Sequence, residues 1–256
     1  MRLLVFCEAG ADFRTTSALV DRVLHDEGPA WVADVLPAHP EAIREWVSDG
    51  QGNQFFDIHY LDKYRRQFKD VRFAYGHFDG KPGAAGAQMA RNAFFIARAV
   101  AKQDASTGLA AVLLVWDMDD QGEERRLGLA QARDEASRRE KFQIVLGCPD
   151  RMREAWVLVG FEPESDEERA RLEELRRELG FSPCDEAHRL DAKDEHAKRS
   201  PKRVLAKLMA GDAEREARCS TGAPLAQLRE RGEQSGLRAF LDEIRNLVVP
   251  LCSAPP

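Results

Sequence analysis

Apolar residues in the first 160 positions fall into short continuous runs, separated by longer stretches in which they recur three or four residues apart. Continuous runs indicate strands buried on both faces, whereas the wider spacing indicates helices. We therefore expect strands at 2–7, 31–36, 71–78, 110–116 and 142–146. The spacing predicts helices at 12–27, 40–48, 57–68, 84–102, 122–140 and 150–159, with a loop at 49–57.

This alternation predicts an α/β fold with a mostly parallel sheet flanked by helices, in a domain that covers residues 1–160. After residue 161 the pattern is helical only. Helices are expected at 165–179, 201–218, 224–232 and 237–249. We interpret residues 161–256 as a helical C-terminal extension that packs on the sheet domain.

Composition narrows the class of protein. The chain is 43% hydrophobic and 32% charged, with a net charge of -6, which disfavours a wholly basic nucleic-acid-binding surface. Its apolar runs are shorter than the roughly 18 residues that a membrane span needs, so no membrane partner is expected. Five widely spaced cysteines without a Cys-x-x-Cys pair are typical of a reducing compartment, and we expect a cytoplasmic protein.

Two of the predicted strands end in carboxylates. The first strand is followed by Glu8, and the 110–116 strand is followed by Asp117, Asp119 and Asp120. If the two strands are neighbours in a parallel sheet, these carboxylates meet at the edge where open α/β sheets bind ligands. Their mutual repulsion would be relieved by a cation, and carboxylate oxygens suit Mg²⁺ or Mn²⁺.

Spacing assigns these carboxylates different roles. Asp117 and Asp119 are two residues apart, so at an extended strand end they point the same way and can share one ion with Glu8. Asp120 either points elsewhere or caps the helix that begins near residue 122. The alternative is that the three aspartates are turn and capping residues only, but no capping geometry requires Glu8.

A strand that ends in Glu with Gly soon after, followed later by a strand that ends in Asp-x-Asp, resembles the topoisomerase–primase (Toprim) domain. The matching residues are Glu8, Gly10, Asp117 and Asp119. Ala9 stands where many members have Gly directly after Glu. In that superfamily the Glu and the Asp pair bind a divalent metal and act on phosphodiester bonds. The resemblance thus implies catalytic and metal-binding roles for Glu8, Asp117 and Asp119.

Two later segments are also similar to small Toprim-like proteins, many of which are encoded near phage-defence or mobile-element genes. They are Pro149 to Trp156, which ends in Glu154-Ala155-Trp156, and Ser200-Pro201-Lys202-Arg203. Glu154 is either a further carboxylate of the metal site or a first-turn residue favoured by the helix dipole.

Basic residues are concentrated at 193–207, which holds six Lys or Arg and two acidic residues. Such a segment beside a carboxylate site suits a phosphate backbone, and the alternative is a solvated helix face. The expected contacts with nucleic acid are Lys198, Arg199, Lys202 and Arg203. His77, near the end of the 71–78 strand, is either a proton donor or a structural histidine.

Together these features predict a Mg²⁺- or Mn²⁺-dependent nuclease with a Toprim-like site, in the setting of anti-phage defence. The alternative is a non-catalytic regulatory or scaffold subunit of a defence complex. In that case the acidic edge binds a metal structurally or binds a protein partner. Titration with a divalent metal and a nuclease assay distinguish the two, and carboxylates without measurable metal binding would favour the alternative.

Overall fold

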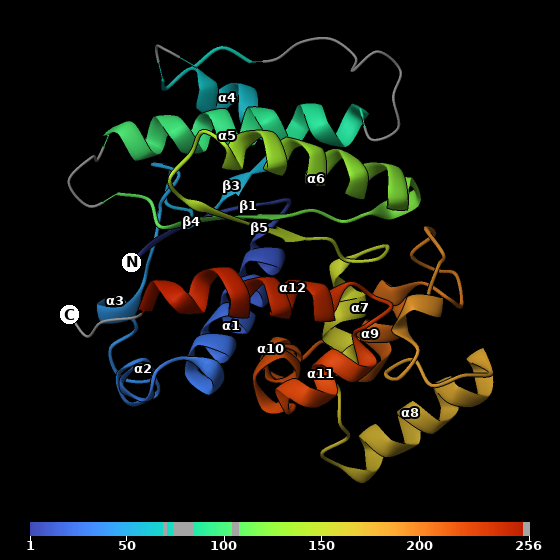
Figure 1. Cartoon of the computed structure of the whole chain (residues 1–256). Helices are drawn as coiled ribbons and strands as arrows, with labels where there is room; N and C mark the ends of the chain where they lie inside the picture. The colour runs from blue at the N-terminus through green and yellow to red at the C-terminus, as the bar shows by residue number, and fades with distance from the viewer. Residues whose placement is uncertain (69–70, 74–83, 104–107, 253–256) are drawn as a thin grey trace.

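The computed structural model describes residues 1–68, 71–73, 84–103 and 108–252. Within these ranges the chain forms a five-stranded parallel sheet with helices on both faces (Figure 1), which confirms the predicted α/β class. The strands are β1 (Arg2–Cys7), β2 (Glu45–Trp46), β3 (Phe56–Asp57), β4 (Ala111–Val115) and β5 (Gln143–Gly147).

The strand order is β2-β1-β4-β5, and β3 pairs with the end of β1 beyond β2. Phe6 lies opposite Leu114 in the register of β1 with β4, as predicted for the two strands that end in carboxylates. On the other side of β1, Cys7 lies opposite Asp57. The carboxyl ends of β1, β3, β4 and β5 therefore reach one edge of the sheet.

Alternate side chains of β1 enter two separate cores. Leu4 and Phe6 face one core, whereas Leu3, Val5 and Cys7 face the other. The first core lies under α4 (Leu61–Arg65), α5 (Ala84–Gln103) and α6 (Gly122–Ser137). The second lies under α1 (Gly10–Glu27), α7 (Arg153–Val159), α10 (Ala213–Gly222) and α12 (Leu237–Glu243).

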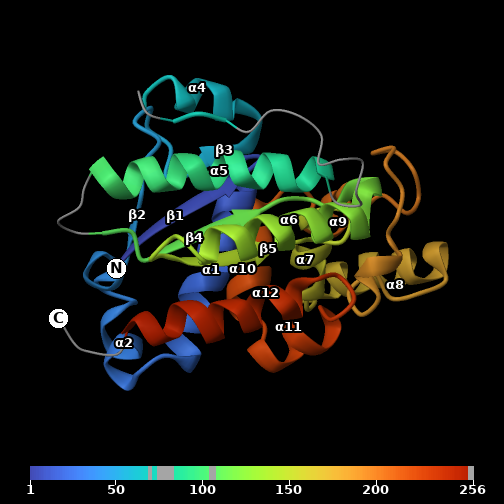
Figure 2. The same ribbon diagram turned by 45° about the horizontal axis from the view of Figure 1, so that its top comes forward.

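The remaining helices lie at the periphery of this second layer (Figure 2). They are α2 (Ala30–Val35), α3 (Pro40–Ile43), α8 (Asp166–Leu179), α9 (Pro201–Met209) and α11 (Leu225–Arg231). After α12 the chain continues through one π-helical turn, Ile244–Val248, and a 3₁₀ turn, Val249–Cys252. None of the helices in the described ranges combines the length and the apolarity needed to span a bilayer.

Segments beyond residue 161 contact the sheet and the helix that follows it. The Trp156 ring stacks on Phe240 of α12 at a centroid distance of 4.9 Å, and its Nε1 donates to the Ser235 carbonyl at 2.8 Å. The Leu146 amide of β5 donates to Glu243 Oε2 at 2.7 Å. The helical extension thus packs on the sheet, while the boundary at residue 160 stays a prediction.

The expected strand at 31–36 is wrong, because these residues form α2. Val32 and Leu36 are both buried, four residues apart, and this spacing suits a helix that begins after Pro29. The expected helix at 40–48 ends at Ile43 and gives way to β2. The expected loop at 49–57 ends in β3, which is two residues long.

The expected helix at 201–218 is two helices. Ala210 and Gly211 have φ angles of 52° and 84°, which end α9. Asp212 then caps α10 by accepting from the amides of Glu214 and Arg215, both at 2.9 Å. In the expected strand at 71–78, residues 71–73 form no regular element, and 74–78 lie outside the described residues.

Candidate functional site

Asp117 lies just after β4, at the carboxyl edge of the sheet, and is partly buried. Its Oδ1 accepts the backbone N–H of Arg153 at 3.0 Å. Burial, together with the negative charges of nearby carboxylates, raises the pKa of Asp117 to about 9. These carboxylates are Asp12, Glu8, Glu154 and Asp119. The structure therefore gathers five acidic side chains at this edge.

Glu8 lies between β1 and α1, next to the short turn that follows β3. His59 in this turn has its Nε2 3.4 Å from Glu8 Oε1, and its backbone amide donates to Asp57 Oδ1 at 2.8 Å. Burial raises the pKa of Glu8, and the charge of Asp119 acts in the same direction, whereas His59 opposes both. Glu8 thus lies close to the second predicted acidic cluster.

The loops after β4 and β5 remain paired beyond the ends of the strands. Three amides donate to facing carbonyls: Trp116 to Gly147 at 2.9 Å, Met118 to Pro149 at 3.0 Å and Asp119 to Arg151 at 3.0 Å. Asp119 and Arg151 both have positive φ angles, 46° and 65°, which are strained for residues other than glycine. Strain of this kind is concentrated at functional sites, and here it is maintained by pairing of the two loops.

The turn at Asp119 differs from the extended strand end that the Asp-x-Asp spacing suggested. Met118 has helical dihedral angles, and Asp119 begins a 3₁₀ turn, Asp119–Gln121. Arg125 Nη1 lies 3.0 Å from Asp119 Oδ2 and also donates to the Asp117 carbonyl. Its guanidinium lies over the Trp116 ring, 4.2 Å from the centroid. Asp119 is therefore held by a cation of α6 while its charge still acts on Asp117.

Asp120 is engaged by basic residues. Arg151 Nη1 donates to Asp120 Oδ1 at 2.5 Å, and Lys193 forms an ion pair with Oδ2. Helix α6 begins at Gly122 without a side-chain cap, so the suggestion that Asp120 caps this helix is wrong. These contacts join the β4 loop to the segment before α9.

Two residues at this edge were not selected as site residues from the sequence. Asp12 accepts the Ala9 amide at 2.8 Å and so stabilises the start of α1, but its Oδ1 also lies 3.5 Å from Arg153 Nε. Burial raises the pKa of Asp12, against the positive charge of Arg153. The sequence could have indicated both residues. Asp12 lies four residues after Glu8, and Arg153 lies inside the Pro149–Trp156 segment.

Glu154 lies in the first turn of α7, with Oε1 3.5 Å from Arg153 Nη2. Its charge is among those that raise the pKa of Asp117, so the structure places it at the acidic edge as well as at a helix start. His77 lies outside the described residues.

The start of α9 lies close to the same carboxylates. Lys202 donates to Glu195 at 2.6 Å, and this bond, with the charges of Glu154 and Asp117, raises the pKa of Lys202. Arg203 instead pairs with Glu178 of α8 at 2.8 Å. Lys198 and Arg199 are exposed. Of the four basic residues predicted to bind nucleic acid, Lys202 has the clearest link to the acidic edge.

The donor set fits a hard divalent cation in its chemistry, because the side-chain donors at this edge are carboxylate oxygens. In the part of the chain that the structure describes, no three His, Cys, Asp or Glu side chains are already arranged to hold a metal ion. Two of the predicted ligands already have partners within the chain, because Asp119 contacts Arg125 and Glu8 contacts His59.

No protein-family model matches the chain, and no curated protein or solved structure matches it either. The Toprim resemblance therefore stays a prediction. The predicted parallel α/β architecture is confirmed by the sheet topology.

Proposed function

We propose that the protein is a divalent-metal-dependent hydrolase of nucleic-acid phosphodiesters that acts at the carboxyl edge of β1 and β4. The observation that carries this proposal is the environment of Asp117. Burial and the negative charges of four carboxylates raise its pKa to about 9, and a divalent cation would stabilise the ionised form.

A bound Mg²⁺ or Mn²⁺ would lower the pKa of a water molecule and stabilise charge on the phosphoryl group. Glu8, Asp117 and Asp119 are the residues we propose as ligands. Glu8 also lies at the partly exposed side of the cluster, where it can accept or donate a proton. Asp12 and Glu154 add negative charge that acts on Asp117.

Nucleic acid as the substrate is supported by the basic residues near α9. Lys198 and Arg199 are exposed. The negative charges of Glu154 and Asp117 contribute to the raised pKa of the next basic side chain, Lys202. Cations beside a carboxylate site can fix a phosphate backbone in place without reading the base sequence. The setting in antiviral defence, and in the cytoplasm, is a proposal that rests on the family resemblance and on cysteine usage.

The test is cleavage of single- and double-stranded DNA and RNA with Mg²⁺, with Mn²⁺ and with EDTA. We expect metal-dependent cleavage by the wild type, which E8Q and D117N reduce to background because each removes one ligand charge. Asp34→Asn removes the same charge from an exposed position on α2 and should cleave like the wild type. Undiminished cleavage by both E8Q and D117N would falsify the assignment.

The rival proposal is a non-catalytic regulatory or scaffold subunit with a protein partner. The ion pairs of Asp119 with Arg125 and of Asp120 with Arg151 favour it, because they offset part of the negative charge of the acidic edge without a metal. Absence of cleavage of all four substrates, with or without Mn²⁺ binding, would support this rival.

A further inference from the structure

Arg153 lies beside the acidic edge and contacts several side chains, and its own side chain is only 8% exposed. Its Nη1 donates to Thr15 Oγ1 at 3.0 Å and to Glu216 Oε1 at 2.7 Å. Its Nε lies 3.5 Å from Asp12 Oδ1, and its Nη2 lies 3.5 Å from Glu154 Oε1. One guanidinium therefore faces three carboxylates, which come from three different helices.

These contacts leave Arg153 poorly suited to bind a substrate phosphate. A substrate-binding arginine presents its donors to solvent, whereas Arg153 directs each of its three nitrogens at a group of the protein. Burial alone would lower the pKa of Arg153, but Glu154, Glu216 and Asp12 raise it, so the guanidinium stays charged. Its role is to orient carboxylates.

Glu216, the partner that bonds Arg153 at 2.7 Å, comes from α10 in the helical extension. Helix α10 approaches α7 closely at Gly160, where a Cβ atom would lie 1.9 Å from the Cys219 carbonyl oxygen. A side chain at this position would collide with α10, so Gly160 permits the close packing of α7 and α10, the helices that carry Arg153 and Glu216.

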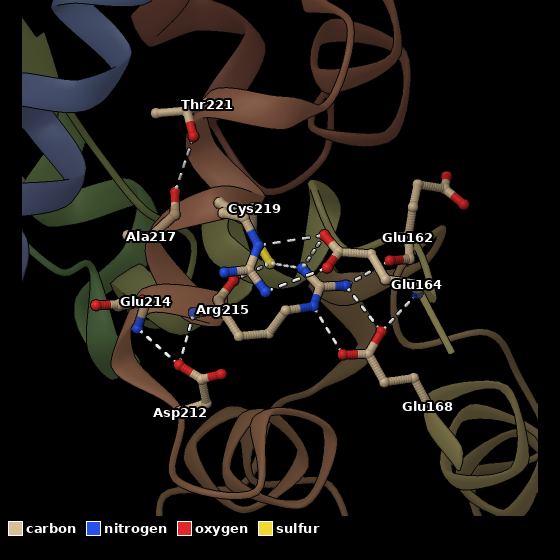
Figure 3. A network of polar contacts seen from close by, with 10 residues as sticks. Glu162, Glu164, Glu168, Asp212, Glu214, Arg215, Ala217, Cys219 and Thr221 are labelled. Carbon is tan, nitrogen blue, oxygen red and sulfur yellow. Dashed lines mark hydrogen bonds and ion pairs between the residues drawn. The ribbon is translucent and has the colours of Figure 1, made fainter. Parts of the chain in front are cut away.

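The neighbouring residue, Arg215, anchors the start of α10 (Figure 3). Arg215 Nε and Nη2 bond the two oxygens of Glu168 at 2.7 and 3.1 Å, and Nη2 also donates to the Glu162 carbonyl. Its guanidinium lies over the Phe161 ring, 4.6 Å from the centroid. Because Arg215 is buried and fixed in this network, it also fixes the backbone of the next residue, Glu216, at the start of α10.

We propose that Glu216 and Arg153 are positioning residues for the acidic edge. Glu216 holds Arg153, and Arg153 holds Asp12 and Glu154 in the orientation that a divalent cation at Asp117 requires. This inference rests on the proposed metal site, and it makes cation affinity depend on the C-terminal helical extension. Arg153 itself contacts a proposed ligand, because its amide donates to Asp117 Oδ1 at 3.0 Å, and outer partners of this kind tune metal sites elsewhere.

The test measures Mn²⁺ affinity of the full-length protein from the electron paramagnetic resonance signal of free Mn²⁺. Glu216→Gln should weaken Mn²⁺ binding by roughly 10-fold or more, the usual effect of losing an outer partner. Glu214→Gln, an exposed change of equal charge on the same helix, should leave affinity within about 2-fold, the scale expected for a screened charge. Thermal melting of each metal-free variant checks that it folds.

Two further variants separate positioning from a general loss of structure. Glu216→Asp keeps the carboxylate and should restore part of the affinity. Arg153→Lys should weaken binding too, and R153K/E216Q should weaken it no more than the stronger single variant, because both changes break one connection. Additive losses would count against the connection.

The outcomes distinguish this inference from the proposed function. If E216Q binds Mn²⁺ like the wild type, or loses no more than E214Q, the inference fails while the metal site stands. If E216Q weakens binding but the wild type cleaves no nucleic acid, the inference stands and the proposed function fails. If the wild type binds no Mn²⁺, both fail.

Discussion

At the scale of single residues, Asp117 links function to stability. Its carboxyl is placed where burial and four neighbouring carboxylates oppose ionisation. Such a placement costs the folded state free energy above the ordinary pKa of the group, because without a cation the buried carboxyl must either keep its proton or carry an unfavourable charge. A residue that is useful to a metal site is thus expected to destabilise the metal-free protein.

We predict that Asp117→Asn raises the melting temperature of the metal-free protein at neutral pH. The pKa of Asp117 rises from 3.8 to about 9 on folding, so its penalty is absent below pH 4 and grows as pH increases towards 9. The advantage of D117N should follow the same course, reaching at least roughly 2–4 °C, the shift that about 1 kcal/mol produces in a protein near this size.

Calorimetry in EDTA from pH 4 to 9 measures this difference, with Asp34→Asn as the control. D34N removes an exposed carboxylate and should melt like the wild type. The D117N side chain keeps the Oδ1 that accepts the Arg153 amide, so a D117N variant that melts below the wild type at pH 8 would contradict the raised pKa of Asp117.

The sequence predicted the convergence of Glu8 with Asp117 because both follow apolar strands, and neighbouring parallel strands end at one edge. It did not reveal Glu216, since a partner of Arg153 that lies 63 residues further along the chain has no local pattern. The turn at Asp119 was also unpredicted, because the positive φ is imposed by pairing with Arg151 rather than by local residue type.

At the scale of elements, α8 and α10 are joined by a buried ion pair. Arg215 and Glu168 have side chains 4% and 10% exposed and form two hydrogen bonds. Removal of one partner from such a pair is costly because the other charge remains buried. The same pair fixes the helix that presents Glu216, so its loss affects the acidic edge indirectly.

We predict that Glu168→Ala lowers the free energy of unfolding by about 3–5 kcal/mol at pH 7. The Arg215 hydrogen bonds lower the pKa of Glu168 below its ordinary 4.5 in the folded state. The stabilisation is therefore complete above pH 4.5 and declines as pH falls through the folded pKa. The gap between wild type and E168A should narrow in acid.

Urea unfolding at pH 7, 5 and 3.5 measures that gap. Glu230→Ala, an exposed change on α11, should stay within about 0.5 kcal/mol of the wild type throughout. A gap that widens in acid would contradict the assigned direction of the pKa shift.

Secondary structure was predicted wrongly where a strand was too short to show a pattern, or where two adjacent helices had the same apolar spacing. Strands β2 and β3 have two residues each, too few to show an alternating pattern. The break between α9 and α10 was marked by Gly211 followed by Asp212, a helix stop and a helix cap, but the apolar spacing on both sides suggested one helix. In contrast, α5 and β4 match their predicted bounds within one residue, because their patterns are long or wholly apolar.

At the scale of the whole molecule, the two faces of the sheet are covered in different ways. Helices α4, α5 and α6 cover one face and all come from the first 160 residues (Figure 1). The other face combines α1 with helices from beyond residue 161, and α12 contacts both β5 and α1. The sheet therefore depends on the C-terminal extension to complete one of its cores.

We predict that residues 1–160 do not fold as an isolated fragment. Without the extension, the Trp156 ring loses Phe240, its Nε1 loses the Ser235 carbonyl, and the Leu146 amide loses Glu243. In the fragment these donors meet water, so the cost lies mainly in the apolar surface that loses its cover, on the order of 1.5–3 kcal/mol for each large side chain that becomes exposed. These losses together approach the typical total stability of 5–15 kcal/mol.

Heteronuclear NMR and thermal melting of the fragment measure its folding, and co-expression with residues 161–256 provides the control. The fragment alone should show poor amide dispersion and no cooperative transition, whereas the co-expressed pair should show both features of a folded protein. In the intact chain, Phe240→Ala should be destabilising by about 3–5 kcal/mol, while Leu251→Ala, at a 37% exposed position, should change stability by about 0.5 kcal/mol at most. A fragment that melts cooperatively by itself would establish residues 1–160 as an autonomous domain and make the extension an addition to a complete fold.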